Sequence, residues 1–336
     1  MRLLPLLCAF ALMGCSANGV AKPIEKNEGK SFADGIFAIT NGGNAQLMTW
    51  SRSGRLNFSN LSLVVQKTLV LKGCKIASVS PYPDGFLVVA TEKQKDNATK
   101  SFIFDVSSSG DILNQWEASK NEFTNGFYSV AYDRGKRLAT TFPFQGEPGE
   151  LVELLPNGTF KHLQKYPNMT FVLPVEGDVP VICSEPNLSK QNFAVAYCTR
   201  HNKTDWKIED TWEKIRPILC DNYLIEENSK YNGGNKSKAQ DKIVVREIEK
   251  GKEINSRSVL SYQSDHGFRF LRCSENRLII GTADIIHIVS VPELKDTDVS
   301  DCGVPEPRDA ILVSDTVYWI NGNGEVESKS IKTKWK

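Results

Sequence analysis

Several features that commonly reveal a function are missing from this chain of 336 residues. Beyond the first fifteen residues it has no apolar run near the ~20 residues that a transmembrane helix needs. Its 41 basic and 40 acidic residues leave a net charge of +1, which excludes the basic surface typical of nucleic-acid binding. It contains no G-x-S-x-G, H-E-x-x-H, P-loop or glycine-rich dinucleotide motif. We therefore expect no enzyme activity, no cofactor, no metal and no nucleic-acid partner.

The cysteines lack the spacing of a zinc site. They form neither two C-x-x-C pairs nor a cluster with the few histidines. Six follow the first fifteen residues: Cys74, Cys183, Cys198, Cys220, Cys273 and Cys302. An even number in an exported chain favours disulfides. Since oxidation tends to join cysteines that are neighbours in the chain, we expect Cys198–Cys220 and Cys273–Cys302.

What the sequence does contain is an export signal. Its start, MRLLPLLCAFALMGC, has one positive charge and an apolar stretch too short to span a bilayer. The ending Leu12-Met13-Gly14-Cys15 resembles the lipobox of bacterial lipoproteins. That resemblance implies a signal peptide over 1–14 and a lipidated Cys15 as the mature N-terminus. Because Ser16 rather than Asp follows, it also implies an outer-membrane anchor facing the periplasm.

Residues 16–31 are polar and have no hydrophobic period, so we predict a lipid-anchored flexible tether over 15–31. A different reading remains open, in which the chain is a secreted eukaryotic glycoprotein with an ordinary signal peptide. It rests on the Asn-X-Ser/Thr sequons at Asn57, Asn60, Asn97, Asn157, Asn168, Asn187, Asn202 and Asn235. Both readings place the mature chain outside the cytoplasm.

Short strands separated by turn residues recur over residues 32–336. Pairs of such strands are Lys75–Ser80 with Phe86–Thr91, Phe127–Tyr132 with Arg137–Phe142, Phe268–Cys273 with Leu278–Gly281, and Ala310–Val313 with Val317–Ile320. Further hairpin turns, with Ser-Gly or Asn-Gly between apolar runs, lie at Ser51–Leu56, Ser107–Ile112, Leu155–Phe160 and Asn321–Val326. The repeat length of about 40–50 residues is similar to that of β-propeller repeat proteins, in which it makes a four-stranded blade.

We therefore predict an all-β fold, a β-propeller of six or seven four-stranded blades over 32–336. Completion of one blade by strands from both termini is left open. Two-sheet β-sandwich domains are the alternative, because strands and turns alone do not separate the two folds. Two segments break the pattern: Lys207–Leu219 has a helical spacing of apolar residues, and Asn228–Asp241 is predicted to be a mobile loop.

Exposed tryptophans are the remaining indication of function, because tryptophan is favoured at interfaces. We take Trp206 and Trp212 as partner-binding residues and expect Trp335 outside the core, whereas Trp116 either binds a partner or packs between blades. We expect a membrane-tethered, non-enzymatic protein-binding module of the bacterial envelope. Its partner would be an assembly factor or a toxin that an immunity-type lipoprotein neutralises. The alternative, a periplasmic glycan hydrolase or lyase, would gather carboxylates in one pocket.

Overall fold

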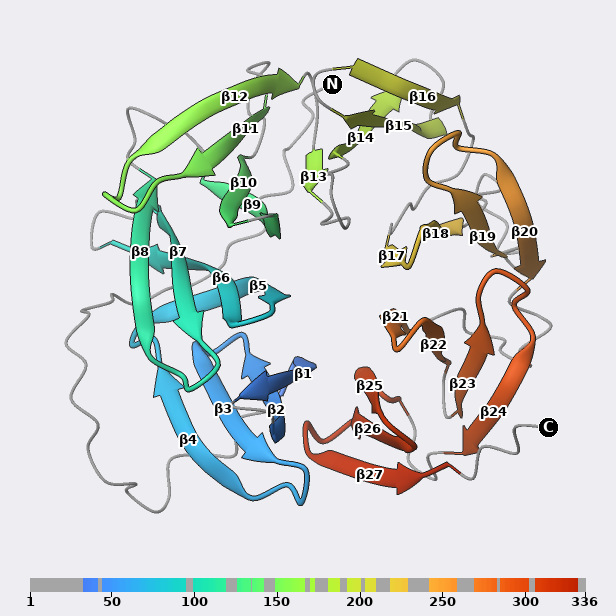
Figure 1. The fold of residues 1–336 in the computed structure, drawn as a ribbon. Coiled ribbons are helices and arrows are strands. Elements are labelled where there is room, and N and C mark those ends of the chain that lie inside the picture. Colours follow the sequence, from blue (N-terminus) through green and yellow to red (C-terminus); the bar gives the residue numbers. More distant parts are fainter. Residues whose placement is uncertain are drawn as a thin grey trace, which may run out of the picture.

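The computed structural model of the chain describes residues 33–41, 44–94, 99–118, 126–133, 135–141, 149–166, 170–172, 181–187, 192–200, 203–209, 218–228, 242–258, 269–282, 285–301 and 306–331. In these residues the regular elements are all β-strands, and no helix capable of crossing a membrane occurs among them. The strands form seven antiparallel sheets arranged in a ring (Figure 1). The predicted β-propeller is confirmed, and the alternative of sandwich domains is wrong.

We number the sheets as blades 1 to 7 in chain order. Blade 1 has β1 (Gly35–Asn41), β2 (Asn44–Ser51), β3 (Arg55–Asn60) and β4 (Val65–Val70); blade 2 has β5 (Cys74–Tyr82), β6 (Gly85–Lys93), β7 (Thr99–Ser107) and β8 (Ile112–Ala118). Blade 3 has β9 (Phe127–Asp133), β10 (Lys136–Thr141), β11 (Gly149–Leu154) and β12 (Phe160–Tyr166); blade 4 has β13 (Thr170–Val172), β14 (Val181–Asn187), β15 (Asn192–Arg200) and β16 (Lys203–Glu209). Blade 5 has β17 (Ile218–Cys220), β18 (Tyr223–Asn228), β19 (Lys242–Glu247) and β20 (Glu253–Ser258); blade 6 has β21 (Phe270–Ser274), β22 (Arg277–Gly281), β23 (Ile285–Ser290) and β24 (Asp296–Asp301). Blade 7 has β25 (Asp309–Val313), β26 (Thr316–Ile320) and β27 (Val326–Ser330).

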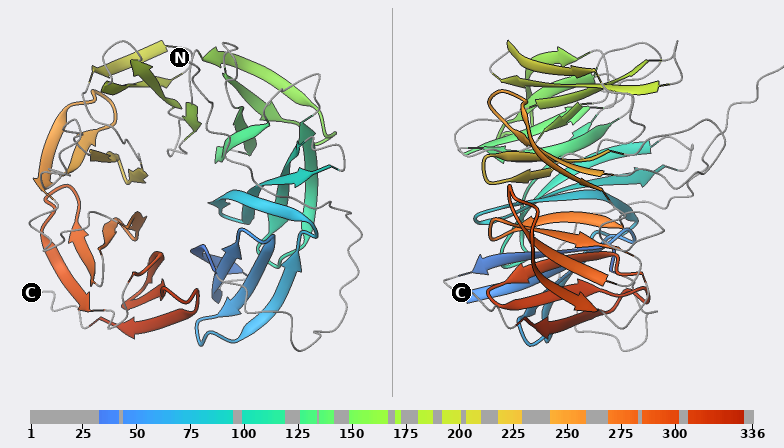
Figure 2. Two further views of the ribbon diagram at one scale, coloured as in Figure 1. Left: turned by 180° about the vertical axis from the view of Figure 1, so that it is seen from behind. Right: turned by 90° about the vertical axis from the view of Figure 1, so that its right-hand side faces the viewer.

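The first strand of each blade lies nearest the centre of the ring and the last lies at its rim (Figures 1 and 2). Because neighbouring strands are antiparallel, the turns between the third and fourth strands lie on the same face of the disc as the turns between the first and second. The turns between the second and third strands lie on the opposite face. Within the described residues, blade 7 has three strands rather than the four predicted for each blade.

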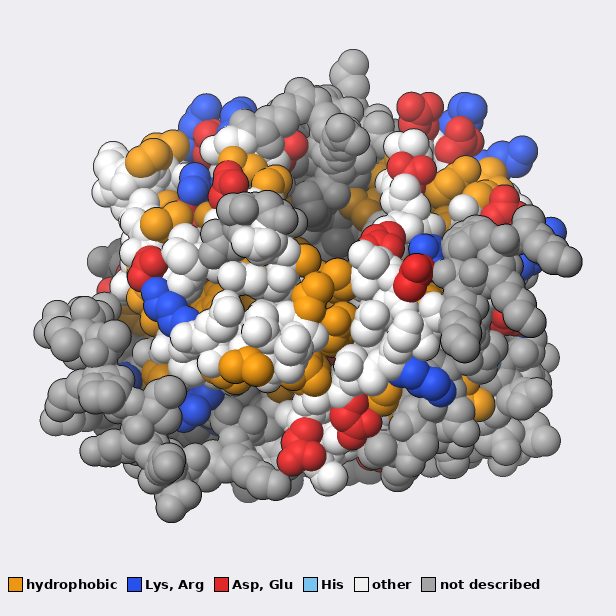
Figure 3. Space-filling model, turned by 60° about the horizontal axis from the view of Figure 1, so that its bottom comes forward, with side chains coloured by type: hydrophobic (Ala, Val, Ile, Leu, Met, Phe, Trp, Pro, Cys, Tyr) orange, Lys and Arg blue, Asp and Glu red, His pale blue; other side chains and the backbone are white. Residues whose placement is uncertain are grey.

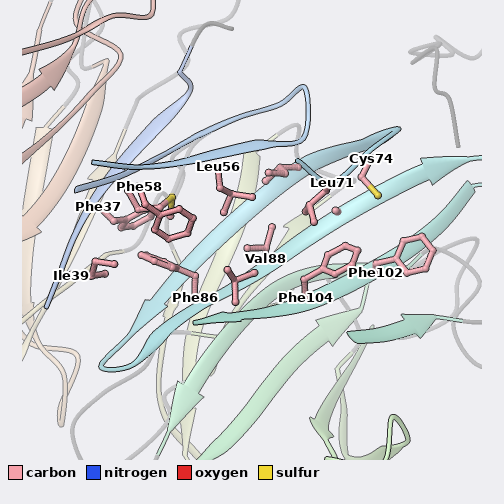
Figure 4. Packing of buried hydrophobic residues seen from close by; sticks show 14 residues of the cluster. Phe37, Ile39, Leu56, Phe58, Leu71, Cys74, Phe86, Val88, Phe102 and Phe104 are labelled. Carbon is pink, nitrogen blue, oxygen red and sulfur yellow. The ribbon is translucent and has the colours of Figure 1, made fainter. Parts of the chain in front are cut away.

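Burial along the strands explains their composition. Both faces of a middle strand contact neighbouring blades, so β6 is a nearly continuous apolar run in which Phe86 to Ala90 are all fully buried. The rim strand β4, in contrast, is mostly exposed or half-buried. Between blades 1 and 2 these runs form a core that includes Phe37, Phe58 and Phe86 (Figure 4).

The predicted hairpins are confirmed. The four strand pairs adjoin as β5–β6, β9–β10, β21–β22 and β25–β26, and the four turns join β2–β3, β7–β8, β11–β12 and β26–β27. Each turn has a glycine with positive φ, which glycine adopts at little cost. At Gly54 a Cβ atom would also lie 2.5 Å from the backbone oxygen of Cys74. This close approach explains why the turn requires glycine.

The expected disulfide pairing is wrong, because Cys220 and Cys273 are bonded to each other. Cys220 ends β17 and Cys273 lies in β21, the first strands of blades 5 and 6. Near the centre of the ring these strands approach, so the Cα atoms lie 5.3 Å apart despite 53 residues of separation. Cys198 lies in β15 of blade 4, and Cys302 lies outside the described residues.

The helical reading of Lys207–Leu219 is also wrong where the segment is described. Residues 207–209 belong to β16 and residues 218–219 to β17, so the blade pattern overrides a spacing carried by only three apolar residues. Of the expected loop Asn228–Asp241, Asn228 ends β18 and the rest lies outside the described residues.

Candidate protein-binding surface

A buried carboxylate joins blades 2 and 3. Asp105 in β7 is 1% exposed and accepts hydrogen bonds from the hydroxyl of Tyr82 at 2.5 Å and from Nε of Arg137 at 2.6 Å. The Arg137 guanidinium also lies over the ring of Tyr132 in blade 3, 5.7 Å from its centroid. Burial, followed by the hydrogen bond to Asp105, raises the pKa of Tyr82, so its hydroxyl remains a donor. These groups hold two blades together.

A second buried carboxylate spans three blades. Asp309 in β25 forms a two-point ion pair with Arg272 of blade 6, with Nε–Oδ1 and Nη2–Oδ2 distances of 2.8 and 2.7 Å. Its Oδ2 also accepts the backbone N–H of Ile36 in blade 1 at 3.0 Å. The Arg272 guanidinium lies 4.6 Å from the ring centroid of Phe37, also in blade 1. Asp309 therefore connects blades 6, 7 and 1.

No group of three or more His, Cys, Asp or Glu side chains is placed to hold a metal ion in the part of the chain that the structure describes. His287 has apolar neighbours on both sides within β23. It is buried, and its Nδ1 lies 3.6 Å from Oδ1 of Asp296. The polar groups around Asp105 and Asp309 therefore stabilise the ring by connecting neighbouring blades.

The exposed large apolar side chains are unevenly distributed. Among the described residues they are Leu61, Val64, Val65, Val70, Ile112, Leu113, Leu163 and Ile254. All except Val70 and Leu163 lie within or directly after a turn between a third and a fourth strand, and so on one face of the disc. Five of them belong to blades 1 and 2, and we call these the rim patch: Leu61, Val64, Val65, Ile112 and Leu113.

An ion pair links the two halves of the rim patch. Lys67 in β4 lies 2.6 Å from Oδ1 of Asp111, which directly precedes β8. The hydrogen bond from Lys67, supported by one from Ser109, lowers the pKa of the Asp111 carboxyl. Asp111 therefore remains charged at neutral pH, and the patch carries apolar side chains around one fixed charged pair.

The rim patch adjoins the boundary between blades 7 and 1. In the view of Figure 3, hydrophobic side chains gather at the middle of the face formed by the lower part of the ring, with polar surface on both sides. The turn before β4 contacts blade 7, since the Tyr318 hydroxyl donates a hydrogen bond to the backbone oxygen of Leu61 at 3.2 Å. Leu63 packs against the core cluster that contains Tyr318 and Ile320.

The tryptophans give mixed results as candidate contacts. Trp116 is 1% exposed and its indole N–H donates to the backbone oxygen of Leu155 in blade 3 at 2.7 Å, so it packs between blades. Trp206 lies in β16, whereas Trp212, Trp335 and the lipidation candidate Cys15 lie outside the described residues. The structure therefore does not bring Trp206 and Trp212 together as a described site.

The rim patch was missed in the sequence, although a signal was available. Val64-Val65 and Ile112-Leu113 are pairs of consecutive apolar residues at the start of a strand. Side chains alternate between the two faces of a strand, so a rim strand cannot bury both members of such a pair in one core. A search for consecutive apolar residues after the predicted turns would have found both pairs.

Solved structures resemble the chain in fold. The β-propeller domain of Cps50 (Swd1) from Myceliophteria thermophila has a TM-score of 0.62 at 9% identity, covering 91% of this chain and 99% of that one. BBS1N, solved in complex with ARL6DN, gives 0.61 at 8% identity and covers 90% and 93%. The computationally designed protein Ika8 gives 0.57 at 11% identity and covers 90% and 96%. At these identities the likeness shows the propeller fold alone. No protein family and no curated protein matches the sequence.

Proposed function

We propose that this chain is a membrane-tethered, non-enzymatic module that binds a protein partner through the rim patch. The observation that carries the proposal is the concentration of exposed large apolar side chains on blades 1 and 2 among the residues that the structure describes. Val64 and Leu113 are each 58% exposed, and they adjoin Val65 and Ile112, the first residues of the fourth strands of adjacent blades. Scattered exposed apolar residues need no explanation, but a set gathered on one face is typical of an interaction site.

The location and the partner follow from the leader. A lipid on Cys15 would hold the propeller at the outer membrane, facing the periplasm. In that compartment the partner would be an envelope-assembly factor or a secreted toxin, and in the second case the chain would act as an immunity lipoprotein. Mass spectrometry of the mature N-terminus tests the anchor. A diacylglycerol-modified Cys15 is expected, and an unmodified N-terminus or glycans on the sequons would contradict it.

Capture of the partner tests the binding surface. The mature chain is used to retain proteins from the envelope and secreted fractions of the native organism, beside the variants Val64→Glu and Leu113→Glu. Both side chains are exposed, so the variants should fold, and each should reduce retention of the specific partner at least tenfold, because a charge replaces an apolar contact at the interface centre.

The matched control is Ile254→Glu in β20 of blade 5, which changes an exposed apolar residue at the start of another fourth strand. Retention should be unchanged in this control. Equal loss in all three variants, or loss in none of them, would contradict binding through the rim patch.

A further inference from the structure

The chain enters the propeller on one face of the disc. The backbone N–H of Ala33 donates to the oxygen of Gly324 at 3.2 Å, in the turn between the second and third strands of blade 7. The carboxylate of Asp34 accepts the backbone N–H of Arg52 at 2.6 Å, in the corresponding turn of blade 1. The chain that precedes Ala33 therefore reaches the disc on the face that carries these turns. We call it the entry face, and it is opposite to the face of the rim patch.

Two exposed cations lie on the entry face where blade 1 leads into blade 2. The backbone N–H of Leu71 donates to the oxygen of Gly54 at 2.8 Å, so the connection from β4 to β5 lies against the turn between β2 and β3. Arg52 belongs to that turn and Lys72 to that connection, and both residues are exposed. The side chain of Arg52 is 78% exposed. Adjoining turns thus present both cations to the solvent.

An exposed apolar residue and a third cation adjoin these turns. Val70 ends β4, is 45% exposed and lies outside the rim patch. Its Cα partner in the ladder between β3 and β4 is Arg55. We call the set the basic corner: Arg52, Arg55, Val70 and Lys72. An apolar side chain among cations suits a membrane interface, because the cations attract anionic headgroups and the apolar group leaves water.

Two carboxylates lie near the basic corner. Asp34 has its Oδ1 3.9 Å from Nε of Arg52, and its Oδ2 is the acceptor for the Arg52 backbone N–H. Glu92 is buried in β6, opposite Cys74 in the ladder between β5 and β6. The three cations therefore outnumber the carboxylates near them in the described part of the chain. The net charge of +1 describes the whole sequence and does not reveal this local excess.

We propose that the basic corner contacts the anionic phospholipid headgroups of the membrane that holds the chain. This contact rests on the lipid anchor of the proposed function, which brings the entry face to the bilayer. Residues 16–32 lie between Cys15 and Ala33 and span at most about 60 Å when fully extended. Three cations attract an anionic surface weakly, but an anchored chain stays beside that surface at a high effective concentration. A weak contact is then sufficient to orient the disc.

The orientation explains how the membrane and a protein partner can be contacted together. With the entry face against the bilayer, the opposite face of the disc points away from it. The rim patch lies on that opposite face, so a partner would reach it from the periplasm without displacing the chain from the membrane.

A chain held on vesicles tests the contact independently of natural lipidation. The mature chain carries Cys15→Ser and an N-terminal hexahistidine, and a nickel-chelating lipid holds it on vesicles of phosphatidylcholine with or without phosphatidylglycerol. On the vesicles that contain phosphatidylglycerol, we expect the amides of residues 52–55 and 70–73 to exchange hydrogen about threefold more slowly or slower still. High salt should remove the difference, because it screens the attraction between exposed charges.

Charge reversal tests which residues make the contact. Arg52→Glu combined with Lys72→Glu should abolish the slower exchange, and since both side chains are exposed this variant should fold. The matched control combines Lys136→Glu with Lys295→Glu, which makes the same change of charge at exposed turns of the opposite face. The slower exchange should persist in this control.

Equal exchange on both kinds of vesicle would overturn the proposal, and so would equal loss of protection in the two double variants. Protection around Val64 and Leu113 in place of residues 52–55 would also overturn it, because the opposite face would then lie on the membrane. An unmodified Cys15 in the native chain would contradict the anchor alone, since the nickel-chelating lipid replaces that anchor in this experiment.

Discussion

Different interactions stabilise the boundary between blades 1 and 2 and the boundary between blades 7 and 1. At the first, a cluster of 14 buried residues fills the space between the sheets (Figure 4). At the second, the buried cluster has five members among the residues that the structure describes: Ala33, Ile36, Leu47, Tyr318 and Ile320. The second boundary also has buried side-chain contacts to the backbone, in which Asp309 accepts the N–H of Ile36 and Tyr318 donates to the oxygen of Leu61.

The difference shows how the ring is closed. Blades 1 and 2 are continuous in the chain, and a large hydrophobic core packs them together, with the Lys67–Asp111 ion pair at the rim. Blades 7 and 1 are the last and first blades of the propeller. Their contact joins residues far apart in the chain, since Ile36 and Asp309 are separated by 273 residues. Hydrogen bonds and an ion pair depend on direction, so they define the relative position of these two blades more precisely than a small apolar contact does.

The largest expected effect is at the hydrophobic boundary. Phe86 is fully buried, and its ring centroid lies 6.1 Å from that of Phe37 and 6.2 Å from that of Phe58. Phe86→Ala should lower the free energy of unfolding by about 3–5 kcal/mol, as measured by denaturant unfolding, because it leaves a cavity in this core. Ile320→Ala is the matched change at the closing boundary and should cost less, about 2–3 kcal/mol. Equal or reversed costs would remove the proposed difference between the boundaries.

An intermediate effect is expected at Asp309. Asp309→Ala leaves Arg272 without its buried ion-pair partner and Ile36 N–H without its acceptor, so it should cost about 3 kcal/mol in the same measurement. Asp309→Asn keeps an acceptor for Ile36 and should cost clearly less. If both variants unfold like the unmodified chain, the polar contacts do not close the ring.

The smallest effect concerns pH at the rim patch. Because the hydrogen bond from Lys67 lowers the pKa of Asp111 in the folded chain, this pair stabilises the fold above the ordinary carboxyl pKa. That contribution is lost as the pH falls through the lowered value. Lys67→Ala should therefore move the Asp111 pKa upward, toward its ordinary range, in an NMR titration of the carboxyl carbon. A pKa that does not move in this variant would show that Lys67 does not hold the carboxylate in solution.

Much of the fold was predictable because it depends on local signals. The turns at Gly54, Gly110, Gly158 and Gly324 all have positive φ, and glycine after a polar residue indicates such turns directly. The pairing of Cys220 with Cys273 was not predictable, because it depends on two first strands meeting near the centre of a ring. The same limit applies to the rim patch, since Lys67 of blade 1 and Asp111 of blade 2 meet only when the two blades pack together.

The rim patch of blades 1 and 2 is proposed to bind a protein. The most direct measurement is hydrogen exchange along the mature chain with and without the captured protein. We predict new protection over residues 60–67 and 108–114, around Val64 and Leu113, with exchange in β20 unchanged. Protection confined to the opposite face of the disc, at turns such as Asn321–Glu325, would contradict the claim.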